Sequence, residues 1–205
     1  LAAQARRLNT DVELLGTVKD TKEEISRMMR KGLQKDILIL SGGVSMGEYD
    51  LVGEVMKDLN THIYFEKVAL RPGKPVIFGK KDRAFIFALP GNPVGAMVSF
   101  ELFVRPSILK SMGHRRLFRP MVMGILQEAV VNEEKRPHLV RGMVSLRNDR
   151  YQVSTTGNQS SGRLSSMIQG NGLIRLAPET SHAAGDEVDV LLLDRGFEMG
   201  EESFP

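Results

Sequence analysis

The chain has 205 residues, a formal net charge of +3 and 41% hydrophobic residues, a composition typical of a globular protein with one or two domains. It contains no cysteine, which excludes a disulfide framework, a thiolate zinc site and a cysteine nucleophile. The small basic excess and an aromatic content of 6% argue against a nucleic-acid-binding surface. Because no apolar run approaches the roughly 20 residues of a membrane helix, we expect a cytoplasmic protein without nucleic-acid or membrane partners.

The first half of the sequence alternates predicted strands and helices. Residues 12–15 and 36–40 are predicted strands, a helix between them begins with a capping-box sequence at Thr21, and another helix covers residues 51–59. The run at 36–40 is almost wholly apolar, as in strands that are buried on both faces of a parallel sheet. This alternation predicts a three-layer α/β domain with a mostly parallel sheet, in which ligands bind beyond the carboxyl ends of the strands.

A glycine-rich turn, Ser-Gly-Gly-Val-Ser-Met-Gly-Glu-Tyr-Asp at residues 41–50, joins one of these strands to the following helix. Its three glycines, Gly42, Gly43 and Gly47, let the backbone turn sharply and let its N–H groups approach a ligand. The helix N-terminus beyond the turn favours an anion. The turn could therefore bind a phosphate, or it could serve only to connect the strand to the helix.

A strand predicted at residues 62–68 leads into the loop Arg71-Pro72-Gly73-Lys74-Pro75. Proline fixes φ and glycine permits a bend, so Arg71 and Lys74 are held at a lower entropic cost than on a flexible loop. Together with Lys67 they could bind a phosphate or another oxyanion. A solvated basic loop is the alternative.

A predicted β-hairpin over residues 76–88 leads into a second strand-to-helix turn, Leu89-Pro90-Gly91-Asn92-Pro93. Asn92 is placed as the N-cap and Pro93 as the first residue of the next helix, which we expect Pro106 to kink or break. In a parallel sheet the glycine turn, the basic loop, this turn and Asp20, which precedes the first full helix, would converge at one edge.

Two aspartates stand where they could hold a divalent cation. Asp20 precedes the first full helix, and Asp50 ends the glycine turn. A hard ion such as Mg²⁺ takes one or two carboxylates together with phosphate oxygens. Helix capping is the alternative role for each, because both precede a helix.

From Arg119 onward the sequence consists of short apolar runs without helical periodicity, which predicts a small all-β domain. We expect an α/β domain over residues 1–113, a barrel-like β domain over 119–195 and a frayed tail over 196–205. A dense polar run at residues 155–167 could bind an anionic polar ligand or form a loop of small polar residues.

Three motifs, at residues 41–50, 71–75 and 89–94, resemble in order and spacing those of the molybdopterin molybdotransferase family, which includes the enzyme domain of gephyrin. The run at 157–167 resembles the C-terminal β domain of that family. The resemblance implies the last step of molybdenum cofactor synthesis, in which molybdate is inserted into adenylylated molybdopterin and AMP is released with the help of Mg²⁺. It also implies a small-molecule pterin substrate and a homodimer.

The resemblance further implies roles for individual residues. Asp20 and Asp50 match acidic positions near the metal and the reacting phosphoanhydride, and Lys67, Arg71 and Lys74 match a catalytic cationic cluster. At position 71 the family commonly has lysine, and arginine keeps the charge but changes the donor geometry. The implied substrate-binding residues lie in the two turns and in the β domain: Ser41, Gly42, Gly43, Ser45, Gly47, Pro90, Gly91, Asn92, Pro93, Ser165 and Ser166.

Family members carry two further N-terminal domains and open the pterin-binding domain with a strand that bears a Thr-Gly-Asp type motif. We therefore expect a C-terminal fragment whose α/β domain is N-terminally incomplete and whose isolated activity is doubtful. Two alternatives remain open, a related molybdopterin adenylyltransferase-like pterin-nucleotide domain and a gephyrin-like scaffold without catalysis. Release of AMP or of pyrophosphate distinguishes the two enzymes, and titration with a receptor-loop peptide tests the scaffold.

Overall fold

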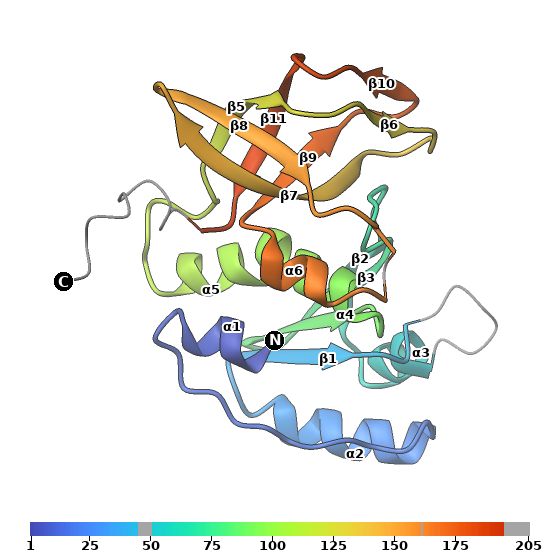
Figure 1. Cartoon of the computed structure of the whole chain (residues 1–205). Coiled ribbons are helices and arrows are strands. Elements are labelled where there is room, and N and C mark those ends of the chain that lie inside the picture. The colour runs from blue at the N-terminus through green and yellow to red at the C-terminus, as the bar shows by residue number, and fades with distance from the viewer. Residues whose placement is uncertain (45–50, 161, 195–205) are drawn as a thin grey trace. The chain divides into compact units, whose positions relative to one another are not determined.

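The structure, a computed structural model, describes most of the chain: residues 1–44, 51–160 and 162–194. These residues form two compact units, each of which is described by itself (Figure 1). We call them the α/β unit, residues 1–68 and 73–118, and the barrel unit, residues 69–72 and the chain from residue 119 on. Among the described residues, no helix is long and apolar enough to cross a membrane.

A four-stranded sheet in the order β1-β4-β3-β2 forms the centre of the α/β unit. Its strands are β1 (Ile37–Ser41), β2 (His62–Lys67), β3 (Pro75–Lys81) and β4 (Ala84–Leu89). Only β1 and β4 pair in parallel, so the expectation of a mostly parallel sheet is corrected to a mixed sheet within the described strands. The physical reason is the two-residue connection between β3 and β4, because so short a turn can join only antiparallel neighbours.

Helices cover both faces of this sheet, which gives the expected three layers. Figure 1 shows α2 and α4 on opposite sides of β1. On one face, α2 (Lys22–Gly32) and α3 (Leu51–Asp58) bury apolar side chains that include Ile25, Met29, Val52, Val55 and Met56. On the other face lie α1 (Ala2–Arg6), α4 (Pro93–Ser99), the π-helix η1 (Phe100–Val104) and α5 (Arg105–Ser111). Alternate residues of the strands contribute to the two cores, since successive strand side chains point to opposite faces.

The predicted helix starts are confirmed by their hydrogen bonds. The hydroxyl of Thr21 accepts a hydrogen bond of 3.4 Å from the backbone N–H of Glu24 and caps α2. The side-chain oxygen of Asn92 accepts from the N–H groups of Val94 at 3.1 Å and Gly95 at 3.4 Å, so it caps α4. Both caps satisfy N–H groups that have no partner within the helix.

One local prediction is wrong, and a second concerns the helix around Pro106. Residues 12–15 belong to no strand; Val12 packs against one core and Leu15 against the other, so burial fixes this segment without β-pairing. At Pro106, where we expect a kink or break, the helix changes type: the π-helix η1 precedes the proline, and the N–H of Arg105 donates to the carbonyl of Phe100, five residues back. The proline then lies in the first turn of α5, where a missing N–H is tolerated.

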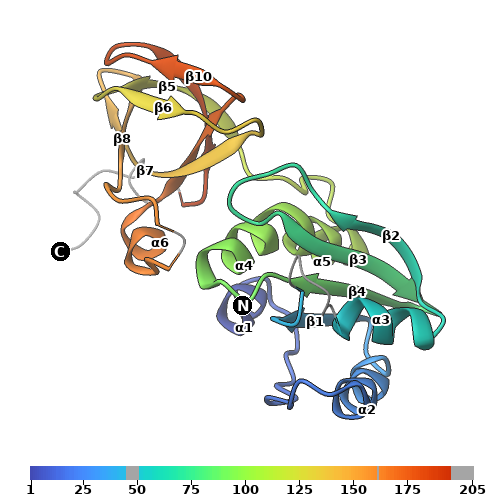
Figure 2. The same ribbon diagram turned by 90° about the vertical axis from the view of Figure 1, so that its right-hand side faces the viewer.

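The barrel unit is a closed barrel in the order β11-β5-β8-β7-β9, which confirms the expected barrel-like all-β architecture (Figure 2). Its strands are β5 (Met121–Leu126), β7 (His138–Arg147), β8 (Arg150–Thr155), β9 (Gly172–Leu176) and β11 (Glu187–Leu192). A two-stranded ribbon of β6 (Val130–Asn132) and β10 (Thr180–His182) and a short helix, α6 (Ser165–Gln169), complete the unit. The sequence did not predict α6, which is five residues long and begins within the polar run.

Replacement of Asn92 by alanine is expected to lower the free energy of unfolding by about 1 kcal/mol, because two N–H groups of α4 lose their acceptor. Urea denaturation followed by circular dichroism measures the change. Gln34→Ala, which truncates an exposed amide of the same unit, is the matched control and should change stability by less than about 0.5 kcal/mol. Equal effects of the two substitutions would contradict the capping role.

Candidate functional site

The two predicted strand-to-helix turns leave the sheet side by side. Ser41 and Leu89 are register partners at the ends of the parallel strands β1 and β4. Beyond them, the N–H of Gly42 donates to the carbonyl of Leu89 at 3.1 Å, and the hydroxyl of Ser41 donates to the carbonyl of Pro90 at 3.1 Å. The carboxyl edge of a parallel pair therefore brings the two motifs together, as expected for this kind of sheet.

Glycines let the backbones around these turns approach closely. A Cβ atom on Gly91 would lie 3.4 Å from the Cα of Gly42, and one on Gly95 would lie 3.5 Å from the backbone N of Gly73. Gly73 has φ +106° and a side chain there would meet the Ser99 hydroxyl at 2.7 Å. The basic loop is thus anchored against the first turns of the helix that follows the second motif. We call this set of segments the turn cluster: residues 41–43, Gly73, 90–92 and Gly95.

Some backbone donors of the turn cluster are available to a ligand. Within the described residues, the N–H groups of Gly43, Gly91 and Asn92 donate to no acceptor. The N–H groups of Val94 and Gly95 are already bonded to the Asn92 side chain. A phosphate at this edge would accordingly be bound by the turns themselves rather than by the capped start of α4.

Asp20 lies at the start of α2, and its carboxylate is exposed. Thr21, not Asp20, caps this helix, so the capping alternative for Asp20 is excluded. The ion pair between Lys22 and Glu54 places the start of α2 against the first turn of α3. Asp20 therefore lies near the helix that follows the glycine-rich turn. The other predicted residues of that turn, Ser45, Gly47 and Asp50, lie outside the described residues.

The predicted cationic cluster is divided between the two units. Lys67 is the register partner of Pro75, and the N–H of Val68 donates to the carbonyl of Lys74 at 3.0 Å, so both lysines lie at one end of the β2–β3 pair. Arg71 instead belongs to the barrel unit.

The backbone of Arg71 pairs with residues 137–139 of the barrel unit. Its N–H donates to the carbonyl of Pro137 at 2.9 Å, and its carbonyl accepts from the N–H of Leu139 at 2.8 Å. Its guanidinium pairs with Glu134 at 2.9 Å, and the second oxygen of Glu134 pairs with Arg136 at 3.2 Å. Sequence reasoning missed this docking because the partners are more than sixty residues apart.

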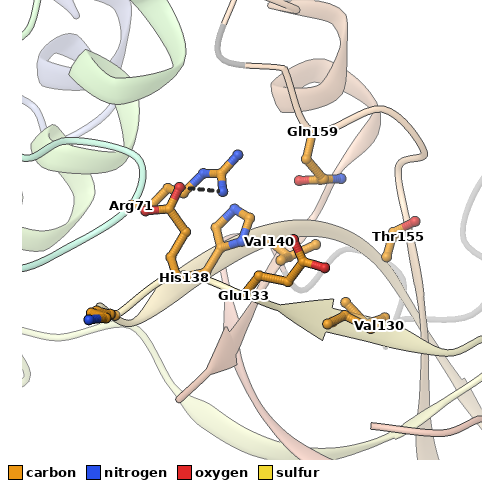
Figure 3. A pocket seen from close by; sticks show the side chains of 10 residues that line it. Arg71, Val130, Glu133, His138, Val140, Thr155 and Gln159 are labelled. Carbon is orange, nitrogen blue, oxygen red and sulfur yellow. Dashed lines mark hydrogen bonds and ion pairs between the residues drawn. The ribbon is translucent and has the colours of Figure 1, made fainter. Parts of the chain in front are cut away.

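An open pocket of about 760 Å³ lies beside Arg71 in the barrel unit. Figure 3 shows its walls, which combine apolar, charged and hydrogen-bonding side chains. The lining residues used below are Arg71, Val130, Val140, His138, Thr155 and Gln159. We call it the His138 pocket.

His138 is the most perturbed titratable group of the described residues. Its side chain is 5% exposed, and its buried Nε2 has no hydrogen-bond partner in the part of the chain that the structure describes. Burial and the nearby charges of Arg71 and Arg141 lower the pKa of His138 to about 4, although Glu134 acts in the opposite direction. The imidazole is therefore neutral at pH 7.

Residues of the predicted polar run form hydrogen bonds with a buried arginine, Arg141, that the sequence analysis missed. Arg141 is 1% exposed, and its guanidinium donates to the Ser166 hydroxyl at 3.1 Å and to the carbonyl of Ser160 at 3.2 Å. The amide of Gln159 accepts from the backbone N–H of Arg141 at 2.8 Å and donates to its carbonyl at 3.2 Å. Ser166 is thus buried and engaged with Arg141, whereas Ser165 is exposed.

Arg141 has no carboxylate partner among the described residues. Burial and the charge of Arg71 lower the pKa of its guanidinium. A buried cation that is neutralised only by neutral acceptors is costly unless an anion completes its coordination. The signal in the sequence was one arginine inside an otherwise apolar strand, residues 139–144.

Two protein-family descriptions match separate parts of the chain. Residues 1–110 match a family described as "Probable molybdopterin binding domain", and residues 123–193 match the "MoeA C-terminal region (domain IV)". "Molybdenum cofactor synthesis protein cinnamon" of Drosophila melanogaster is 38% identical over 149 residues, which are 71% of this chain and 24% of that protein. A "Molybdopterin molybdenumtransferase" of Staphylococcus epidermidis is 30% identical over 196 residues, which are 95% of this chain and 47% of that protein.

Solved structures show the same fold. The molybdopterin biosynthesis MoeA protein of Pyrococcus horikosii superposes with a TM-score of 0.76 at 26% identity, over 95% of this chain and 46% of that one. A molybdenum cofactor biosynthesis protein of Pyrococcus furiosus superposes with a TM-score of 0.69 at 25% identity, over 93% of this chain and 62% of that one. The chain spans half or less of the length of both relatives described above, 47% and 24%.

Gly73→Ala is expected to destabilise the protein more than Gly16→Ala, although both glycines have positive φ. The backbone cost of about 1–2 kcal/mol is common to both, but only the Gly73 Cβ meets a neighbour, and this clash adds roughly 1–3 kcal/mol. Urea denaturation of the two variants measures the difference. Equal losses would show that the close approach to Ser99 does not restrict the loop.

His138→Gln is expected to reduce the loss of stability in acid. Because the folded-state pKa of His138 is lowered to about 4, the unfolded chain binds an extra proton between about pH 6.5 and pH 4. With respect to this group, the free energy of unfolding has its full value above about pH 6.5. It falls by at most about 3 kcal/mol as the pH drops to 4. Urea denaturation at pH 8, 6, 5 and 4 measures this fall, and exposed His62→Gln should keep the wild-type profile.

Proposed function

Because this chain belongs to the family of probable molybdopterin-binding domains, we propose that it inserts molybdenum into adenylylated molybdopterin and releases AMP. The observation that carries the proposal is the turn cluster, in which two strand ends present backbone N–H groups that have no acceptor among the described residues, beside a loop that bears Lys74. Such a surface suits a phosphate-bearing ligand. The barrel unit matches the MoeA C-terminal region, and this match favours molybdenum insertion over the activity of an adenylyltransferase.

The proposed reaction balances without an oxidant or reductant. The two thiols of the pterin replace an oxygen of molybdate as sulfur ligands, and one water is formed. Cleavage of the phosphoanhydride consumes one water, so that one phosphate stays on the pterin and AMP leaves. The chain's task is to bind two anionic substrates and to stabilise the charge that develops at the anhydride.

Each unit contributes its own groups to this task. In the α/β unit, Gly43 and Gly91 would donate backbone N–H groups to the pterin phosphate, while Lys67 and Lys74 would stabilise the charge of the anhydride. In the barrel unit, Arg71 and Arg141 supply positive charge for molybdate, the second anionic substrate. The predicted roles of Ser41, Ser45, Gly47, Pro90, Asn92, Pro93, Ser165 and Ser166 in substrate binding remain part of the proposal.

Mg²⁺ would fit the proposal, because it needs only one or two protein carboxylates when the substrate carries phosphate groups. Among the described residues no three acidic or histidine side chains cluster, which excludes an all-protein metal cage in that part of the chain. Asp20 is exposed and not used as a cap, so it suits an ion that needs only one or two carboxylates. With Asp50 it would hold Mg²⁺, which supplies positive charge at the anhydride. A homodimer and a cytoplasmic location complete the proposal.

The experiment that tests the function measures AMP release by the chain. Purified chain is incubated with adenylylated molybdopterin and Mg²⁺, with and without molybdate, and the nucleotide products are separated by chromatography. We expect AMP to be released in a molybdate-dependent manner, in equal amount to the molybdenum that becomes bound to the pterin. Binding of the pterin nucleotide without AMP release would refute catalysis by this chain, and pyrophosphate release would favour an adenylyltransferase.

Asp20→Asn is expected to lower the rate of AMP release by roughly 100-fold, because the metal loses a charged ligand at the reacting anhydride. The rate should recover in part at higher Mg²⁺ concentration. Asp11→Asn, which changes another exposed aspartate of the same unit, is the matched control and should retain the wild-type rate. An unchanged rate in Asp20→Asn would remove this residue from the proposed metal site.

A further inference from the structure

We propose that the His138 pocket binds a tetrahedral oxyanion, which accepts hydrogen bonds from the guanidinium of Arg71 and from Nε2 of His138. The pocket lies wholly within the barrel unit and shares no residue with the turn cluster. The inference rests on the proposed function only for the class of ligand, because that reaction consumes molybdate and releases a phosphate ester. The role assigned to His138 rests on the geometry of the pocket.

The charges around the pocket favour an anion. Glu134 pairs with Arg71 at 2.9 Å and with Arg136 at 3.2 Å, so one carboxylate serves two guanidinium groups. Arg141 adds a third guanidinium, which has no carboxylate partner among the described residues. The two further charges of the lining, those of Glu133 and Lys135, cancel each other. The surroundings of His138 therefore carry a net positive charge.

The imidazole of His138 supplies a polar atom that has no partner among the described residues. Its Nε2 is buried, and the side chain is one of those that line the pocket. The backbones of Arg71 and His138 form a β-bridge, and Figure 3 shows the guanidinium and the imidazole close together. A buried polar atom without a hydrogen bond is unfavourable, so a ligand that supplies the missing partner is favoured.

Other side chains of the pocket can contact the remaining oxygens of an anion or the body of a larger ligand. Thr155 supplies a hydroxyl on one side, while Val130 and Val140 form an apolar wall. The volume of about 760 Å³ admits a free oxyanion with water or the phosphate group of a larger molecule. Both sources share one chemistry, a tetrahedral anion with oxygen acceptors.

Binding should be coupled to uptake of a proton by His138. In the free protein, burial, Arg71, Arg141 and Arg136 lower the pKa of His138 to about 4, and Glu134 alone raises it. A bound anion opposes the effect of the three arginines and raises the pKa, so the imidazole becomes protonated and donates from Nε2. The affinity for the anion therefore increases as the pH falls through the pKa of the bound state.

The experiment uses sulfate as the probe, because sulfate keeps its charge over the whole pH range. The chain, labelled with ¹³C-histidine, is titrated with sodium sulfate at pH 5 and pH 8, with sodium chloride at equal ionic strength as the control. We expect the His138 resonances to move toward those of imidazolium at pH 5. If the bound state has a pKa of about 6 to 6.5, sulfate binds roughly 10- to 30-fold more tightly at pH 5 than at pH 8.

His138→Gln separates proton coupling from general electrostatics. The glutamine keeps an amide donor but does not titrate, so the ratio of the two affinities should fall to about 1. His62→Gln, which removes an exposed histidine of the other unit, should keep the wild-type ratio. Backbone amide spectra of each variant verify that the barrel unit is folded. Unmoved His138 resonances in the folded chain, or a wild-type ratio in His138→Gln, would overturn the proposal.

A competition arm identifies the source of the anion. If AMP displaces sulfate, the pocket binds the phosphate of an ester, and if AMP does not displace bound sulfate, the pocket selects a free oxyanion such as molybdate. Neither titration requires adenylylated molybdopterin. Failure of the chain to release AMP would therefore refute the proposed function while leaving sulfate binding intact. Failure of sulfate binding, with AMP still released, would refute the His138 site and the assignment of Arg71 to molybdate.

Discussion

The parallel pairing of β1 with β4 is the constraint on which the α/β unit depends. It places Ser41 opposite Leu89, so the two glycine-containing turns leave the sheet at the same edge. An antiparallel pairing would send them to opposite ends and separate their backbone donors by the length of a strand. The sheet need not be parallel elsewhere, because one parallel pair is sufficient to form the turn cluster. The other strands extend the surface on which helices of both layers pack.

The parts of the fold that the sequence predicted are those set by local chemistry. The caps at Thr21 and Asn92 and the hairpin before Leu89 each depend on residues a few positions apart. The sheet as a whole was predicted to be mostly parallel, because the alternation of strands and helices at the start of the chain was given more weight than the predicted hairpin of β3 and β4, which makes the sheet mixed. The docking of Arg71 onto β7 has no local signal, since it is decided by backbone pairing across distant parts of the chain.

The candidate site divides in the same way. Glycine and proline requirements are local, so the motifs of the turn cluster could be found from spacing alone, and the structure then shows that they meet. The polar run of residues 155–167 was harder to interpret, because hydroxyls and amides suit either a ligand or the protein. In the barrel unit Gln159 and Ser166 form hydrogen bonds with Arg141. The run therefore positions the guanidinium of Arg141, and this role could be recognised only from the tertiary structure.

Burial of Arg141 and His138 in the barrel unit is unfavourable by itself, and a bound anion would offset this free-energy cost. Replacing a buried ionic group by apolar side chains often leaves a protein equally stable or more stable, so stability alone gives no reason to bury Arg141. The same holds for His138, which stays neutral among three arginines and whose Nε2 has no partner within residues 1–44, 51–160 and 162–194. Both costs fall when an anion arrives, because the anion neutralises the guanidinium charge and supplies an acceptor for the imidazole. Groups that are unfavourable in the empty protein and favourable in the complex make binding selective for charge.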